Sequence, residues 1–200
     1  LISPRSYLGI SSNWRRQGST DEISKTVVPE LEVKHAIEPH APQFTYAREL
    51  GVTTALVTPG NRNVIGGQGV VIKTDGIVVD KMVVQDRAVM VFGLGVSAKR
   101  EKQMPSTRMG IAAVMRETLT KAREYMTKKE RDALKKKTDT EGDNKKAEDP
   151  PADTFKVGDL AMEALIPVLE GKMPVIAHCE RRDDILTILR IADRSEEHTS

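Results

Sequence analysis

Short apolar runs separated by polar segments predict an α/β chain with a buried sheet. The runs are rich in β-branched residues and are bounded by glycine, proline or charged residues, which is typical of buried strands. They cover residues 1–10, 52–57, 70–74, 77–84, 88–94 and 174–178. Between the third and fourth runs, Asp75 and Gly76 have the composition of a hairpin turn. We therefore expect several strands, two of them joined as a hairpin.

Helical periodicity fills the longer segments between these strands. The longest helix is expected after Pro105, with Ser106 or Thr107 as its N-cap. Its apolar residues recur every three or four positions and predict one core-facing stripe, formed by Ile111, Met115, Leu119, Ala122 and Met126. Shorter helices are predicted at 45–50, 159–169 and 185–192. Asp183 or Asp184 is expected to cap the last of them.

Two segments depart from this periodicity. Residues 138–156 are charged, contain proline and hold almost no apolar side chains, so they are predicted to be a disordered insertion. Residues 194–200, RSEEHTS, do not continue the pattern and match the translation of a common sequencing-library adapter. We therefore expect residues 1–193 to form one domain and residues 194–200 to be an artefact without structure.

Composition excludes several classes of protein. The 31 Lys and Arg residues nearly balance the 29 Asp and Glu residues, so the formal charge of +2 makes no case for nucleic acid binding. A single cysteine, Cys179, excludes an internal disulfide framework. No apolar run approaches the roughly 18 residues that indicate a membrane span. The composition defines no compartment, and the cytoplasm is the default expectation.

A glycine-rich segment offers candidate ligand contacts. It follows the buried run 52–57 and a turn at Pro59 and Gly60. We predict a loop whose backbone N–H groups form a nest for an anion, although the glycines could instead serve only to permit a tight loop. With the asparagines before it, the segment supplies the candidate substrate-binding residues Asn61, Asn63, Gly66, Gly67 and Gln68.

Four segments, in order, resemble motifs of one family. They are LISPRSYLGI at 1–10, GVTTALVTPGNRNVIGGQGVVIKTDG at 51–76, KQMPSTRMGIAA at 102–113 and DLAMEALIPVLEGKMPVIAHCERRDDILTILRIA at 159–192. Together they resemble the amidohydrolase superfamily, in particular its imidazolonepropionase-like metal-dependent hydrolases. The resemblance implies a partial (β/α)₈ TIM barrel. Because a closed barrel needs about 250 residues, we expect this chain to be a piece of a longer protein.

The resemblance also implies a metal centre. Members use a divalent metal such as zinc, which polarises a carbonyl and activates water, held by an H-x-H pair on the first strand, a middle-strand lysine and later histidines. The first three positions fall here on Arg5, Tyr7 and Val91. Arginine has no lone pair to donate, tyrosine coordinates only as phenolate, and valine offers no ligand atom. If the register slipped, Lys73 or Lys81 would be the alternative middle-strand ligand.

Two later positions keep groups that can bind metal or move protons. His178 matches a family metal ligand, and Glu180 replaces the second histidine of H-A-H. Glu180 could be a ligand, a catalytic base or the partner of Arg5 in an ion pair across the barrel mouth, and the ion pair is the favoured interpretation. Cys179, between them, should point into the packing layer because side chains alternate along a strand. His35 is expected at the surface.

Two functions therefore stay open. The first is a hydrolase that acts on non-peptide carbon–nitrogen bonds, including those of cyclic amides, through a modified metal site. The second is a barrel that has lost its metal and serves as a binding or structural module. Both imply a small-molecule ligand, no nucleic acid and no membrane, and both allow a homo-oligomer. Zinc is expected to bind weakly or not at all.

Overall fold

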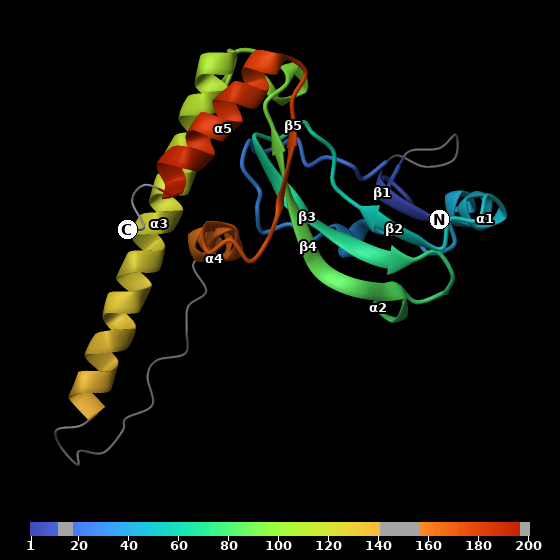
Figure 1. Cartoon of the computed structure of the whole chain (residues 1–200), viewed down its shortest axis with the longest axis horizontal. Coiled ribbons are helices and arrows are strands. Elements are labelled where there is room, and N and C mark those ends of the chain that lie inside the picture. Colours follow the sequence, from blue (N-terminus) through green and yellow to red (C-terminus); the bar gives the residue numbers. More distant parts are fainter. Residues whose placement is uncertain (12–17, 141–156, 197–200) are drawn as a thin grey trace.

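A curled five-stranded sheet forms the centre of the molecule (Figure 1). This computed structural model describes residues 1–11, 18–140 and 157–196. The strands are β1 (Ile2–Ser6), β2 (Thr54–Val57), β3 (Ile65–Lys73), β4 (Val83–Gly93) and β5 (Val175–His178). The helices are α1 (Pro42–Glu49), α2 (Val79–Met82), α3 (Arg108–Thr140), α4 (Val157–Leu169) and α5 (Arg182–Glu196), with 3₁₀ turns η1 (Val33–Ala36) and η2 (Val96–Ala98).

The sheet is mixed, and its spatial order follows the chain from β1 to β5. Strand β1 pairs in parallel with β2, and β4 pairs in parallel with β5. Strand β3 is antiparallel to both of its neighbours, so the other four strands all run in one direction. The predicted α/β class is confirmed, and the curled sheet is compatible with half of a barrel. The antiparallel β3 is an addition to the simple alternation of strand and helix.

The glycine-rich segment is a strand and not the predicted loop. It lies in β3, where Gly69 is paired with Val89 of β4. A Cβ on Gly69 would stand 2.8 Å from Val89 Cγ1 and 2.9 Å from the Val57 carbonyl oxygen. Gln68 N donates to the Leu31 carbonyl at 2.7 Å. The backbone groups are thus used in pairing, and the predicted anion nest is wrong. The glycines serve close approach of neighbouring backbone and side chains.

The predicted hairpin is present with a longer connection. Strands β3 and β4 are antiparallel, and Gly76 in their connection has φ of +142°. The second strand begins at Val83, because residues 79–82 form α2 and bury Met82 under the sheet. The expected strand at 77–84 is therefore wrong over most of its length.

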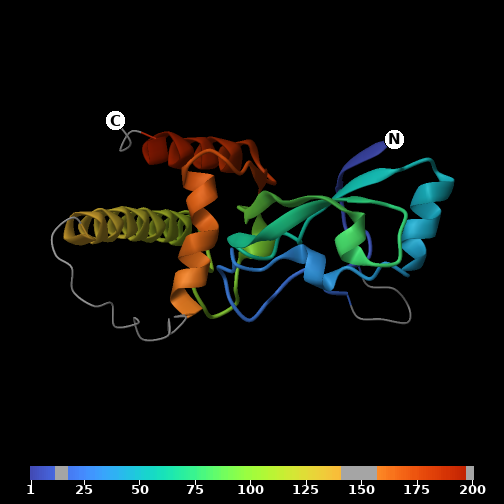
Figure 2. The ribbon, with the colours of Figure 1, turned by 90° about the horizontal axis from the view of Figure 1, so that it is seen from below.

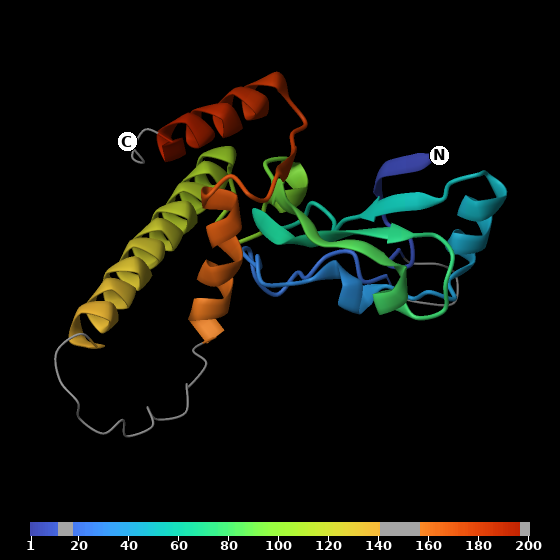
Figure 3. The same ribbon diagram turned by 60° about the horizontal axis from the view of Figure 1, so that its bottom comes forward.

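Two core clusters attach the helices to the sheet. In the first, Ile65, Met90 and Phe92 pack with α3, α4 and α5, and in the second, Val57, Val70 and Ile72 pack with α1 and η1. Figures 2 and 3 show α3, α4 and α5 gathered at one end of the molecule and α1 at the other. The predicted stripe of α3 is confirmed from Ile111 to Ala122, where its residues are buried, whereas Met126 is half-buried.

Helix ends differ from the predictions in detail. Thr107 caps α3, because its Oγ1 accepts a hydrogen bond from Gly110 N at 3.0 Å. Helix α3 extends to Thr140, so residues 138–140 are helical, and the rest of the predicted insertion, 141–156, lies outside the described residues. Helix α5 continues to Glu196, so residues 194–196 do have structure, while 197–200 are not described. Within the described part of the chain, no helix has the length and apolar character needed to cross a bilayer.

Candidate functional site at the strand ends

The carboxyl ends of β1, β2, β4 and β5 meet at one edge of the sheet. Since these strands are parallel, the residues that follow them gather at this edge, where α/β barrels place their active sites. The structure divides the predicted residues into two groups. Arg5 and Tyr7 lie at the end of β1, and His178 and Glu180 lie at the end of β5.

Arg5 and Tyr7 form a local cluster with Thr58, the residue that follows β2. Arg5 Nε donates to Thr58 Oγ1 at 3.4 Å, and Arg5 Nη2 donates to the Tyr7 hydroxyl at 3.3 Å. The guanidinium carbon lies 5.9 Å from the centre of the Tyr7 ring, within the range of a cation–π contact. The two residues that were expected at the family's H-x-H positions therefore interact with each other.

The predicted ion pair between Arg5 and Glu180 is wrong. Arg5 belongs to β1 and Glu180 follows β5, and these two are the outermost strands on opposite sides of the five-stranded sheet. Glu180 faces Arg108 instead, with Oε2 at 3.9 Å from Arg108 Nη2. The first turn of α3 brings a guanidinium to the end of β5, so Glu180 has a cation beside it without Arg5.

Arg108 also makes a shielded ion pair that sequence reasoning missed. Its Nε donates to Asp184 Oδ1 at 3.0 Å, and the Asp184 side chain is only 5% exposed. Asp184 Oδ2 accepts from Arg181 N at 3.1 Å, so this aspartate caps α5 from inside its first turn. Asp184 was expected to stand before a helix at 185–192, but α5 begins at Arg182. Arg108 and Asp184 both lie in sequence segments that carried the family resemblance. Their place in these segments was the signal that could have pointed to the pair.

His178 and Cys179 differ in what they offer to chemistry. His178 is half-buried at the end of β5, opposite Gly93 in the ladder. Cys179 packs against the helical core cluster, which confirms its predicted orientation. Burial raises the pKa of the Cys179 thiol, and the nearby Asp184 carboxylate raises it further. The thiol is therefore neutral near pH 7, which argues against a nucleophilic role.

The donor atoms at this edge do not fit a zinc site. Arg5 is permanently charged, the Tyr7 hydroxyl accepts a hydrogen bond, and the buried Val91 has no donor atom. The alternative Lys73 bonds Thr54 at 3.1 Å at the start of β2, away from the strand ends. Among the described residues, no three His, Cys, Asp or Glu side chains form a group that could hold a metal. Zinc prefers four such ligands, or three with water.

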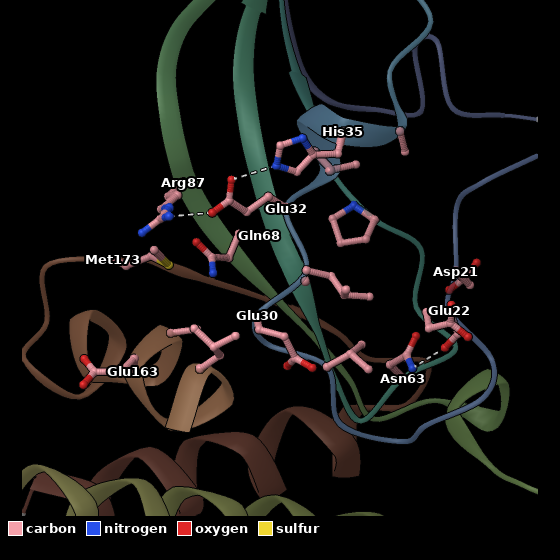
Figure 4. Close-up of a pocket in the computed structure, with 18 of the residues that line it drawn as sticks. Asp21, Glu22, Glu30, Glu32, His35, Asn63, Gln68, Arg87, Glu163 and Met173 are labelled. Carbon is pink, nitrogen blue, oxygen red and sulfur yellow. Dashed lines mark hydrogen bonds and ion pairs between the residues drawn. The ribbon is translucent and has the colours of Figure 1, made fainter. Parts of the chain in front are cut away.

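A cavity of about 1060 Å³ lies between β3, β4, α4 and the segment 18–36 (Figure 4). Of the predicted substrate-binding residues, Asn63, Gly67 and Gln68 line it. Asn61 lines a smaller cavity of about 650 Å³ beside Tyr7, and Gly66 is part of neither lining. Their role in binding substrate stays a prediction.

Asn63 has a visible structural role. Its Nδ2 donates to the carbonyl oxygens of Glu22 and Lys25, both at 2.7 Å. The side chain is 4% exposed, and it ties the segment before β3 to residues 22–25. These bonds hold the wall of the larger cavity in place.

An ion-pair network borders the same cavity. Glu32 pairs with Lys34 and Arg87, Lys34 also pairs with Asp86, and the exposed His35 lies 3.4 Å from Glu32. Burial by itself would raise the pKa of Glu32, but the hydrogen bonds from Lys34 and Arg87 outweigh it and lower the pKa. The pKa of Asp86 is lowered in the same way, mainly by its hydrogen bond from Lys34 acting against burial.

Acid should therefore weaken the fold through this network. A carboxylate whose pKa is lowered on folding contributes stability above its unfolded pKa and loses it as pH falls through the folded value. We expect the free energy of unfolding to drop between about pH 5 and pH 3. Glu32→Gln should be about 1 kcal/mol less stable than wild type at pH 7, and its free energy of unfolding should depend less on pH in this acid range. Urea denaturation across this pH range measures both. Parallel profiles for the two proteins would contradict the assignment.

The fold and site define an α/β half-barrel with a polar strand-end edge, and comparison with known proteins agrees. The chain is similar to the crystal structure of an amidohydrolase from Thermotoga maritima MSB8, at 33% sequence identity and a TM-score of 0.80. The match covers 98% of this chain and 48% of that one, so the chain spans about half the length of its structural relative. No protein-family model and no curated protein matches the chain. The similarity supports the amidohydrolase resemblance in general terms.

Proposed function

We propose that this chain is part of the barrel of an amidohydrolase-type hydrolase that acts on non-peptide carbon–nitrogen bonds. The observation that carries the proposal is the similarity to the Thermotoga maritima amidohydrolase in both sequence and fold. The curled sheet, with four parallel strand ends at one edge, is the arrangement on which such a site would be built. Small cyclic amides, the substrates implied by the imidazolonepropionase-like resemblance, are the first class to test.

In this proposal Glu180 and His178 carry the chemistry that this chain contributes. Both follow from the end of β5, and the Glu180 carboxylate is about one-third exposed, so it can reach a ligand. Arg108 Nη2 lies 3.9 Å from the Glu180 carboxylate. A charged carboxylate could accept a proton from the water that attacks an amide carbonyl.

A second function, an inactive barrel that binds a ligand or stabilises an assembly, has its own supporting observation. Arg5 contacts Tyr7 and Thr58, and the resemblance implies that Arg5 and Tyr7 stand at the family's first metal-ligand positions. A cation held there could take the place of a metal charge without activating water. The two functions predict different results for turnover, because the hydrolase converts a substrate and the inactive barrel does not.

Turnover by the full-length protein on a panel of cyclic and linear amides tests the choice. We expect hydrolysis of at least one cyclic amide, and Glu180→Gln should lower kcat/KM by about 100-fold, as for loss of a general base. Glu170→Gln is the matched control, because Glu170 is a carboxylate in an exposed pair with Lys172. Unchanged kcat/KM in Glu180→Gln would remove the glutamate from the mechanism, and no turnover of any substrate would favour the inactive barrel.

Zinc should be substoichiometric in the purified protein. The reason is the donor set that the resemblance implies, in which Arg5, Tyr7 and Val91 stand at three ligand positions of the family. Elemental analysis of the full-length protein, prepared without chelator, measures the content. Arg5→His/Tyr7→His restores two imidazoles at the end of β1 and should raise the zinc content, since imidazole is a preferred zinc ligand. One zinc per chain in the wild type would contradict the prediction.

A further inference from the structure

We propose that the cavity between β3, β4 and α4 binds a small organic cation, one that carries N–H donors on an apolar body such as an alkylguanidinium. This site uses other residues than the strand-end chemistry, so it does not depend on the proposed hydrolysis. The cavity, at about 1060 Å³, has room for such a molecule.

Gln68 supplies the first argument. The residue is only 4% exposed, and its Nε2 donates to the Pro29 carbonyl at 2.9 Å. That bond assigns the amide orientation, because the Pro29 carbonyl can only accept. Gln68 Oε1 is then a buried acceptor with no hydrogen-bond partner among the residues that the structure describes. Figure 4 shows the carboxamide between Glu32 and Met173, on the wall of the cavity.

Glu30 supplies the second. Its Oε2 is also buried and has no hydrogen-bond partner in the described part of the chain, and Glu30 lines the same cavity. A buried carboxylate oxygen without a partner is costly. The four other acidic side chains of the lining have partners. Glu32 pairs with Lys34 and Arg87, and Glu163 pairs with Lys129. Asp21 Oδ1 accepts from Arg62 N, and Glu22 Oε1 accepts from Ser24 N. The walls of the cavity therefore hold two buried acceptor oxygens without a hydrogen-bond partner among the described residues, one of them on a carboxylate.

The chemistry of the occupant follows from these acceptors and from the apolar wall. Two acceptors require a ligand that donates, and the charge of Glu30 favours a cation. A metal ion is a poorer fit, because no group of three metal-binding side chains exists among the described residues. One part of the remaining wall is apolar and suits an alkyl chain: Val28, Leu31, Leu160, Ala164, Ile166 and Met173. Polar and charged side chains, Arg87 and Lys129 among them, line the rest, and both of these cations are paired with glutamates.

Calorimetric titration of the full-length protein with butylguanidinium is the test. We expect saturable binding, and binding of tetramethylammonium at least about tenfold weaker, because that cation has no N–H donor. Glu30→Gln and Gln68→Met should each weaken butylguanidinium binding about tenfold. Glu163→Gln is the matched control, since Glu163 lines the cavity but already has its partners, Lys129 and Tyr125.

A second measurement makes the test independent of how the variants fold. The methyl resonance of Met173 can be assigned with Met173→Leu. Its chemical shift should change during the titration, and a fit of this change should give the same Kd as calorimetry. Absence of binding would overturn the proposal, as would equal affinity for tetramethylammonium. Binding that leaves the Met173 resonance unmoved, or that Glu163→Gln weakens as much as Glu30→Gln does, would place the ligand elsewhere and also overturn it.

Discussion

Asp184→Asn is expected to lower the free energy of unfolding by about 2–3 kcal/mol. Breaking a fully buried ion pair costs roughly 3–5 kcal/mol, because the remaining charge is left without a partner. Asp184 is 5% exposed, but Arg108 is 33% exposed and keeps Glu180 at 3.9 Å, so the cost should fall below that range. The variant also weakens the cap that Asp184 gives to Arg181 N. Urea denaturation followed by circular dichroism measures the change.

Asp183→Asn is the matched control for this prediction. Asp183 stands in the same first turn of α5 and has the same charge, so both variants lose the same favourable interaction with the helix dipole. Its carboxylate is 57% exposed and pairs with Arg181 at 3.1 Å, an arrangement worth less than about 1 kcal/mol. Equal destabilisation in the two variants would show that the Arg108 pair contributes nothing beyond the helix dipole.

The coupling between Arg108 and Asp184 can be separated by a double-mutant cycle. Residues in one ion pair show interaction energies of about 0.5–3 kcal/mol, whereas independent residues are additive. Arg108→Gln and Asp184→Asn should therefore cost less together than the sum of the two single variants. This pair links the start of α3 to the start of α5 beside the strand ends, next to Glu180.

Elements that local pattern defines could be predicted from the sequence. The strand β2 and the stripe of α3 follow from β-branched runs and from helical spacing. In β2, Ala55 and Val57 are buried, and in the stripe the residues from Ile111 to Ala122 are buried as expected. Thr107 was one of the two N-cap candidates because hydroxyl side chains satisfy the free N–H groups of a helix start. In each case the information lies within a few residues of the element itself.

The glycines of β3 could not be assigned in this way. Glycine favours loops by its backbone freedom, but it also permits close packing inside a strand. The choice depends on Leu31 and Val89, which approach β3 from distant parts of the chain. The same limit applies to the site. The resemblance placed Arg5 and Glu180 at one barrel mouth, but only the strand order shows that they stand at opposite edges and that Arg108 reaches Glu180.

Gly93→Ala should be the more damaging of two matched substitutions at the end of β4. A Cβ on Gly93 would stand 2.7 Å from the Asn61 carbonyl oxygen and still closer to that of Asn63. These are backbone atoms, and they cannot move freely, because Asn63 is tied to residues 22 and 25 and Gly93 N itself donates to the Val64 carbonyl at 3.0 Å. Such overpacking costs typically about 1–3 kcal/mol, and we expect the upper end here.

Gly95→Ala isolates the cause. A Cβ on Gly95 would approach Glu180, at 2.6 Å from its Cδ, but this is the end of a flexible side chain that can turn away. Neither glycine has a positive φ, so alanine is allowed at both, and the loss of unfolded-state entropy stabilises both variants equally, by about 0.4–1 kcal/mol. The difference between their unfolding free energies therefore measures packing against residues 61–63. We expect urea denaturation to give a difference of about 2 kcal/mol. Equal free energies of unfolding for the two variants would show that residues 61–63 move aside without cost. This segment would then not be the rigid wall that a ligand site requires.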